Sequence, residues 1–264
     1  RAGDTVTIMS MHTPETIYAI YGLNYIGAVA NMVYMTLTEK EILHSVDNTE
    51  SKFLLVLDAA LEKVETIKAK LCVPVVVLGV ADSMPPHIKL GYRLKVKPKK
   101  HAFIAWRGFL RQGASEAPMT TDHAAPAVIV YTSGTTGEPK GVILSSYNIT
   151  SIAFQARMAG YHLERKKRFL NILPPFLGFG ITMLHETLGA GLNIHLWIQL
   201  NPNTIAKQFV KERPEFFVTG PAFVDAIAAQ KHTDLSNILF FGGGGGALSK
   251  KSQDDINTYL KKCN

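Results

Sequence analysis

Several features that define other protein classes are scarce or absent in this sequence of 264 residues. It has only two cysteines, Cys72 and Cys263, which stand far apart and form no CxxC pair. Neither a disulfide framework nor a zinc-binding cluster is therefore expected. No apolar run reaches the length of a membrane span, and no signal peptide opens the chain. These absences favour a reduced, cytoplasmic setting.

Acidic residues are missing from one stretch of the chain. Between Ser83 and Ser115 the sequence holds eight Lys or Arg residues and no Asp or Glu, although the whole chain carries a net charge of only +7. The remainder has 20 basic and 21 acidic residues. The basic character therefore belongs to this segment alone, and nucleic acid is not an expected partner.

Two interpretations of this basic segment remain open. Apolar or aromatic residues at every second position from Ile88 to Val96 predict an edge strand with a solvated basic face. A short helix packed on the domain is expected next, with an apolar face of Phe103, Ile104, Trp106, Phe109 and Leu110. Alternatively, residues 83–115 contact an anionic surface at the inner face of a membrane, where each Lys or Arg contributes about 1 kcal/mol.

Short apolar strands alternate with helices along the chain, which predicts an α/β fold with mostly parallel sheets. Strands are expected at 6–11, 53–57, 73–80, 169–173 and 216–219. Thr13 before Pro14 predicts one helix start, and Thr38 with Glu41 predicts a capping box at another. Because Arg1 is followed almost at once by the first strand, we expect an internal piece of a longer protein.

The segment with most chemical content begins with the apolar, β-branched run Val128–Val130 and ends at Lys140. Glycines in the loop allow backbone N–H groups to approach a ligand, and hydroxyls and the lysine add donors and charge. This combination predicts a polyphosphate cradle. A plain surface turn is the alternative. The predicted phosphate-binding residues are Thr132, Ser133, Gly134, Thr135, Thr136, Gly137 and Lys140.

The string from Tyr131 to Gly141 resembles the phosphate-loop signature of the adenylate-forming superfamily, which includes acyl-CoA synthetases, luciferases and peptide-synthetase adenylation domains. The resemblance extends over essentially the whole chain. It implies an incomplete N-terminal AMP-binding domain of two layered α/β subdomains, at residues 1–155 and 156–264. It also implies ATP and CoA as co-substrates, with Mg²⁺ bound mainly through phosphates.

Further site residues are implied by the same resemblance. The element Leu173–Gly180 is similar to a Leu-Pro-x-Phe-His-x-Phe-Gly string that borders the acyl site, with Leu177 in place of the usual His. The implied substrate-binding residues are Phe176, Leu177, Gly178, Thr219, Gly220 and Pro221. The implied adenine-binding residues are Gly244, Gly245, Gly246 and Ala247. Lys140 and Thr136 are the implied catalytic residues.

The implied activity is formation of an acyl-adenylate from a carboxylic acid, with a fatty acid as the expected substrate, followed by transfer to CoA. Two alternatives stay open: transfer to an acyl carrier protein, and a nucleotide-binding module without catalysis. The family's ribose-binding Asp and second catalytic Lys have no counterpart here, so residues 1–264 alone are expected to be inactive. No protein metal site is expected, because His185-Glu186 lacks a second His at Gly189 and His195 stands in an apolar strand.

Overall fold

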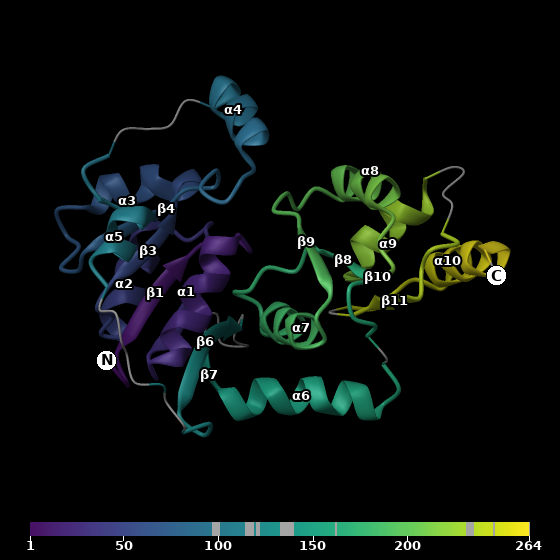
Figure 1. Ribbon diagram of the computed structural model, residues 1–264, viewed down its shortest axis with the longest axis horizontal. Coiled ribbons are helices and arrows are strands. Elements are labelled where there is room, and N and C mark those ends of the chain that lie inside the picture. Colours follow the sequence, from purple (N-terminus) through teal and green to yellow (C-terminus); the bar gives the residue numbers. More distant parts are fainter. Residues whose placement is uncertain are drawn as a thin grey trace. The chain divides into compact units, whose positions relative to one another are not determined.

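The computed structural model describes residues 1–96, 101–113, 119, 122–132, 140–161, 163–230, 235–244 and 246–263. The described chain forms two compact units, whose elements are labelled in Figure 1. Unit 1 comprises Arg1–Ile149 and Pro175–Gly178, and unit 2 comprises Thr150–Pro174 and Phe179–Asn264. Helix α6 (Ser146–Met158) carries the chain from the first unit into the second. The boundary expected after residue 155 lies within this helix.

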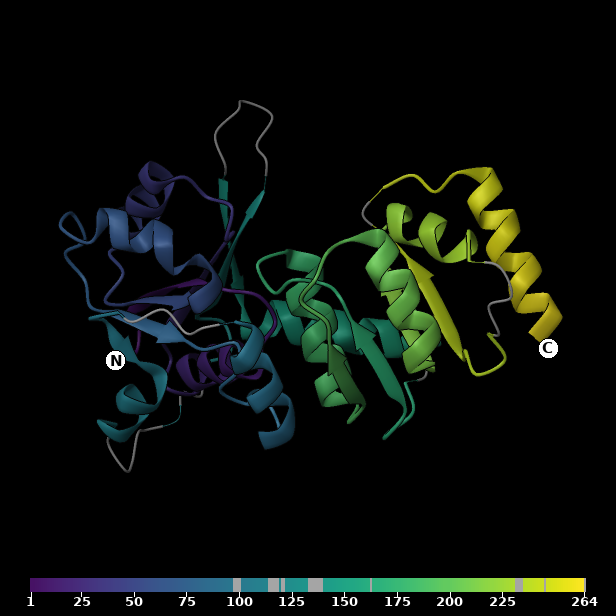
Figure 2. The same ribbon diagram turned by 90° about the horizontal axis from the view of Figure 1, so that it is seen from above.

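Unit 1 contains a seven-stranded sheet in the order β5-β4-β3-β1-β2-β6-β7. Neighbouring strands are parallel except for β6 and β7, which form an antiparallel hairpin and lie side by side in Figure 2. The strands are β1 (Thr5–Met9), β2 (Val29–Val33), β3 (Leu54–Leu57), β4 (Val75–Leu78), β5 (Ile104–Ala105), β6 (Pro126–Thr132) and β7 (Lys140–Ser145). The expected α/β class with mostly parallel sheets is confirmed.

Helices connect the parallel strands of unit 1, as parallel pairing requires. They are α1 (Pro14–Tyr25), α2 (Glu39–Asn48), the 3₁₀ helix η1 (Asp58–Ala60), α3 (Leu61–Ile67), α4 (Pro86–Lys95) and α5 (Trp106–Arg111). Both expected helix starts are confirmed. Thr13 caps α1 by accepting a hydrogen bond from the Thr16 N–H, with Pro14 as the first helical residue. Thr38 and Glu41 close a capping box at the start of α2.

Strand β2 is not among the strands expected from the sequence, because Asn31 interrupts its apolar run. The Asn31 side chain is fully buried, and its Nδ2 donates to Thr7 Oγ1 at 2.9 Å and to Ser45 Oγ at 3.0 Å. Thr7 Oγ1 lies 2.7 Å from Ser51 Oγ, and Ser45 Oγ lies 3.5 Å from Tyr131 Oη. Burial of an amide is tolerated when it is hydrogen-bonded. The network therefore links the middle of β2 to β1, α2 and β6.

Unit 2 contains a four-stranded, wholly parallel sheet in the order β11-β10-β8-β9. Its strands are β8 (Arg168–Asn171), β9 (Asn193–Leu196), β10 (Phe216–Thr219) and β11 (Phe240–Gly243). Its other helices are α7 (Gly178–Gly189), α8 (Pro202–Glu212), α9 (Pro221–Ala228) and α10 (Lys250–Cys263). Within the described part of the chain, no helix is both long and apolar enough to cross a bilayer.

The two faces of this second sheet bury different clusters, because successive residues of a strand point to opposite faces. Phe217 packs in a core with residues of α8, α9 and α10, including Phe209, Val224 and Ile256. Its neighbours Phe216 and Val218 pack in another core, which Met183 of α7 adjoins. Unit 2 is thus a parallel sheet with helices on both faces, as its near-continuous apolar strands predict.

The edge strand expected from Ile88 to Val96 is wrong, since this stretch forms helix α4. Pro86 occupies the first turn of the helix, where its missing N–H costs nothing, and its fixed φ favours the helical conformation. The helix expected from Phe103 is only partly confirmed. Ile104–Ala105 pairs with β4 as strand β5, and α5 begins at Trp106. Two-residue alternation predicts a strand because one face of a strand is buried, whereas most of the described side chains of α4 are exposed.

An ion pair at the amino ends of β8 and β10 provides a test of this fold. The Arg168 N–H and Nε donate to Glu215 Oε2 at 2.8 and 3.1 Å, and Nη2 donates to Oε1 at 3.4 Å. Partial burial by itself raises the pKa of Glu215, but the hydrogen bonds from Arg168 outweigh it and hold this pKa below its usual value. The pair therefore stabilises the fold above about pH 4.3, and this contribution is lost as the pH falls through the folded-state pKa.

We expect Glu215→Gln to lower the free energy of unfolding by about 1–2 kcal/mol at pH 7, with a difference that shrinks as the pH falls below about 4. Urea denaturation across this pH range measures it. Glu164→Gln is the matched control, because Glu164 is 59% exposed and lies 3.9 Å from Lys167. A Glu215→Gln penalty independent of pH would contradict the role given to the carboxylate charge.

Candidate functional site

The β6–β7 hairpin holds the two ends of the predicted phosphate loop. Strand β6 runs parallel to β2, so Thr132 lies at the edge of the sheet where the other parallel strands end. Strand β7 returns antiparallel, and Thr132 is paired directly with Lys140. The five predicted residues between them, Ser133, Gly134, Thr135, Thr136 and Gly137, lie outside the described residues. The structure therefore places the first and last members of the predicted site side by side.

Thr132 and Lys140 have the chemistry and the position to bind an anion. Both are exposed, and directly opposite residues of an antiparallel pair project from the same face. A hydroxyl donor and an ammonium group on one face suit a phosphate. The carboxyl edge of a parallel sheet is also where α/β proteins bind their ligands. These residues fit a polyphosphate.

Tyr131 connects this hairpin to the buried network around Asn31. Its hydroxyl is 3.5 Å from Ser45 Oγ. A Cβ at the paired position, Gly141, would stand 3.5 Å from the Tyr131 ring and 3.2 Å from Ile129 Cγ2. Glycine at 141 therefore lets both side chains lie across the partner strand. The position of β6 just before the loop is thus set by packing and by hydrogen bonds of the sheet.

The predicted acyl-site residues Phe176, Leu177 and Gly178 belong to unit 1. Phe176 is buried, and its ring packs on Tyr34 with centroids 4.5 Å apart. Leu177 is half-buried. A Cβ on Gly178 would meet Val130 Cγ2 of β6 at 3.8 Å. The structure thus brings this turn against the strand that leads to Thr132, which residue spacing alone does not indicate.

The other two groups of predicted residues meet in unit 2. The Gly244 N–H donates to the Thr219 carbonyl at 3.0 Å. A Cβ on Gly220 would lie 3.8 Å from the Gly244 carbonyl oxygen, and a Cβ on Gly246 would lie 3.5 Å from Pro221 Cγ. Pairing of β10 with β11 therefore joins Thr219, Gly220 and Pro221 to the loop that begins at Gly244. Ala247 is exposed, and Gly245 lies outside the described residues.

Two details make this part of unit 2 suitable for a planar ligand. Thr219 is fully buried, and its Oγ1 has no hydrogen-bond partner among the described residues. The ring of Phe179 lies within 3.7 Å of the place where a Cβ on Gly244 would stand. Bare peptide backbone beside an aromatic ring suits a flat ring such as a nucleobase. Phe179 is not among the site residues assigned from the sequence, although it stands between two glycines of the matched string.

The histidines considered as metal ligands have protein partners. His185 Nε2 lies 3.3 Å from Thr150 Oγ1, and burial lowers the pKa of His185. Burial raises the pKa of its neighbour Glu186, against the opposing charge of Arg157. His195 Nδ1 lies 2.8 Å from Glu212 Oε2. Within the described ranges, no three His, Cys, Asp or Glu residues are grouped to hold a metal.

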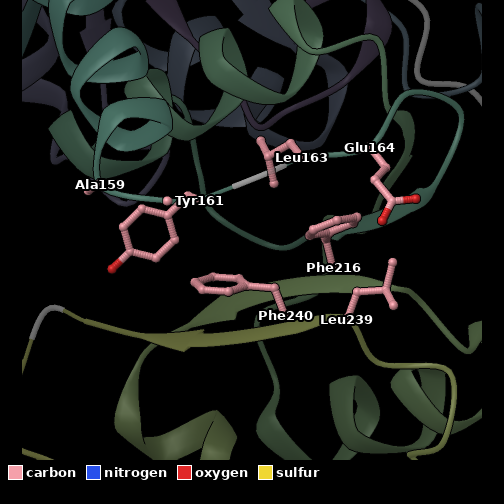
Figure 3. A pocket seen from close by; sticks show the side chains of 8 residues that line it. Ala159, Tyr161, Leu163, Glu164, Phe216, Leu239 and Phe240 are labelled. Atoms are coloured by element: carbon pink, nitrogen blue, oxygen red, sulfur yellow. The ribbon is translucent and has the colours of Figure 1, made fainter.

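A pocket of about 490 Å³ in unit 2 lies away from all these residues. Figure 3 shows Tyr161 and Leu163 on one wall, facing Phe216, Leu239 and Phe240 on the other. Phe216 and Phe240 are the first residues of β10 and β11, whereas Thr219 and Gly243 are the last. The pocket therefore opens at the opposite end of these strands from the candidate site, and it is not anticipated by the sequence motifs.

Comparison with known proteins identifies relatives along the whole chain. Residues 1–263 match a family described as AMP-binding enzyme. A long-chain-fatty-acid–CoA ligase from Bacillus subtilis (strain 168) is 26% identical over 252 residues, which cover 89% of this chain and 45% of that protein. The chain thus spans about half the length of this curated relative.

Two solved structures illustrate the shared fold. A red-emitting luciferase from Phrixothrix hirtus matches with a TM-score of 0.80 and 20% identity, over 98% of this chain and 49% of that one. The N-terminal domain of FACL13 from Mycobacterium tuberculosis matches with a TM-score of 0.77 and 21% identity, over 98% of this chain and 61% of that one. At these identities the two matches establish the fold alone.

The turn before α7 yields a prediction about glycine. A Cβ on Gly180 would lie 1.9 Å from the Pro174 carbonyl oxygen, which is a backbone atom that cannot easily move aside. We expect Gly180→Ala to lower the free energy of unfolding by about 1–3 kcal/mol, as overpacking does. Urea denaturation measures the change.

The matched control is Gly189→Ala in the same helix, where no atom lies within 4 Å of the added Cβ. This substitution is expected to leave stability unchanged or to raise it by up to about 1 kcal/mol. Equal effects of the two substitutions would show that the close approach to Pro174 does not constrain this turn.

Proposed function

This chain belongs to the AMP-binding enzyme family, and we propose that it takes part in the ATP-dependent activation of a carboxylic acid. The observation that carries the proposal is the Thr132–Lys140 pair. It holds a hydroxyl and an ammonium group at the two ends of a loop rich in glycine, serine and threonine. Such a set of donors is suited to the phosphates of ATP.

In the proposed reaction, a carboxylate oxygen attacks the α-phosphorus of ATP, and the bond to the leaving pyrophosphate breaks. The product is an acyl-adenylate. The acid is ionised at neutral pH because its pKa lies near 4, so this step needs no general base. The thiol of CoA then attacks the acyl carbonyl, gives up its proton to solvent and displaces AMP.

Catalysis in this scheme rests on positioning and charge stabilisation. Lys140 and Thr136 are proposed to stabilise the charge that develops on the transferring phosphate. Mg²⁺ would be held largely by phosphate oxygens. The nucleobase is proposed to lie along Gly244–Ala247, where Phe179 flanks the backbone of Gly244.

A fatty acid is the proposed substrate. The half-buried Leu177 makes the turn after β8 more apolar than an imidazole would. Apolar walls suit an acyl chain because they gain free energy as methylene groups leave water. The name of the Bacillus subtilis relative points in the same direction. In unit 2, Thr219, Gly220 and Pro221 are proposed as substrate-binding residues.

Lys140 provides the test of the nucleotide site. We expect Lys140→Met in the full-length protein to reduce acid-dependent ATP–pyrophosphate exchange by about 100-fold, the cost of losing one charge-stabilising group. The control is Lys68→Met, because Lys68 is 62% exposed and far along the chain from the hairpin. Fatty acids of graded length serve as substrates. Exchange that Lys140→Met leaves unchanged would exclude the proposed role of this side chain.

Residues 1–264 by themselves are expected to form no thioester, since they carry no counterpart of the family's ribose-binding Asp and second catalytic Lys. Incubation with ATP, Mg²⁺, CoA and a fatty acid, followed by mass spectrometry of the products, measures this. Acyl-CoA formed by this piece would contradict the expectation. ATP binding by the full-length protein without exchange on any acid would instead favour a nucleotide-binding module and overturn the ligase proposal.

A further inference from the structure

Helix α4 presents apolar side chains to solvent. Leu90 and Leu94 are 64% and 78% exposed, and Ile88 and Val96 at its ends are also exposed. In the view of Figure 1, α4 lies above α3 and β4, at the upper end of unit 1. A helix of a globular protein normally turns such residues toward the core. The face of α4 that carries the two exposed leucines is therefore a candidate contact surface for an apolar partner.

The face of α4 that carries Lys89 interacts with unit 1. Lys89 Nζ donates to the Asp82 carbonyl at 3.3 Å and lies 3.8 Å from the Asp82 carboxylate. Among the residues of α4 whose side chains are described, Lys89 and Tyr92 are the partly buried ones, and residues three apart share a face. Leu90 and Leu94 are four apart and form a second row. Rotation by 100° per residue places this row opposite Tyr92, so the leucines point away from the body of the unit.

The sequence around the two leucines is basic, with eight Lys or Arg residues and no acidic residue between Ser83 and Ser115. Arg93 and Lys95 belong to the same helix, and Lys97, Lys99 and Lys100 follow it in the sequence. Arg107 and the exposed Arg111 lie in α5. The nearest acidic residue before the helix, Asp82, already faces Lys89 and Arg107 at 3.8 Å each. Exposed apolar side chains within a basic segment that contains no acidic residue from Ser83 to Ser115 are the two attributes of a helix that lies in a membrane interface.

We propose that α4 docks unit 1 on an anionic lipid bilayer, with Leu90 and Leu94 inserted among the acyl chains near the headgroups. The exposed Arg107 and Arg111 of α5 would face lipid phosphates, which supply the matching negative charge. A nucleic acid would match the positive charges but would provide no apolar environment for the two leucines. One short helix gives weak binding, so the contact would be peripheral and reversible. This proposal does not depend on the proposed ligase activity.

Co-sedimentation of the full-length protein with vesicles tests the proposal. The vesicles are phosphatidylcholine alone and phosphatidylcholine with about one-third phosphatidylglycerol. We expect binding to the anionic vesicles that weakens as salt is raised, because salt screens the charges. The double variant Leu90→Gln/Leu94→Gln should partition at least about tenfold more weakly, and Arg111→Gln about fivefold.

The matched control is Ile152→Gln/Met158→Gln on α6, where the two side chains are 48% and 74% exposed. It should bind vesicles as the natural protein does. All variants alter exposed positions, and urea denaturation verifies that each remains folded. Equal loss of binding in both double variants, or absence of binding to anionic vesicles, would overturn the proposal. A protein that self-associates through Leu90 and Leu94 without binding vesicles would overturn it too.

A fluorescent label locates the docking face directly. An environment-sensitive fluorophore attached to Leu94→Cys, with Cys72 and Cys263 replaced by serine, should shift to the blue when anionic vesicles are added. The same label on Leu188→Cys in α7, where the side chain is 40% exposed, should not shift. A shift at residue 188 without one at residue 94 would assign membrane contact to another surface and refute the role of α4.

Discussion

The candidate site depends on one constraint, the common direction of strands β1 to β6 in unit 1. Parallel strands must be joined by crossovers, so their carboxyl ends collect at one edge of the sheet. Strand β7 alone in this sheet runs back, and its pairing with β6 brings Lys140 beside Thr132. The charge of Lys140 therefore lies at the edge of the sheet where the parallel strands end.

A network of buried polar groups stabilises the position of β6 in this sheet. Asn31 sits at the centre of the sheet and donates to Thr7 and Ser45, and Ser45 reaches the hydroxyl of Tyr131. A buried amide that is hydrogen-bonded in this way favours one register, because a slip of β2 would leave it without partners. The residue just before the predicted loop is thus coupled to the packing of β1, β2 and α2.

Unit 2 offers a different chemistry at the corresponding end of its own sheet. Glycines after β11 leave the backbone bare beside Pro221 and Phe179, and the hydroxyl of Thr219 is buried with no hydrogen-bond partner in the described part of the chain. Such a surface is suited to recognition by shape and by main-chain groups, whereas the hairpin of unit 1 is suited to recognition by charge. In contrast to both, α4 exposes Leu90 and Leu94 to solvent, while Lys89 on another face pairs with Asp82.

The sequence by itself determined the α/β class, the helix caps at Thr13 and Thr38, and the string that ends at Lys140, because each is a local pattern of polarity or capping. The alternation from Ile88 to Val96 predicted a strand, but this pattern does not exclude a helix whose side chains are mostly exposed. It missed β2, since one buried asparagine breaks the apolar run. Only the tertiary structure decided that Gly178 lies on Val130, that Gly244 lies against Phe179, and that Thr219 is buried. These contacts join residues that are distant in the sequence, and strand pairing in three dimensions creates them.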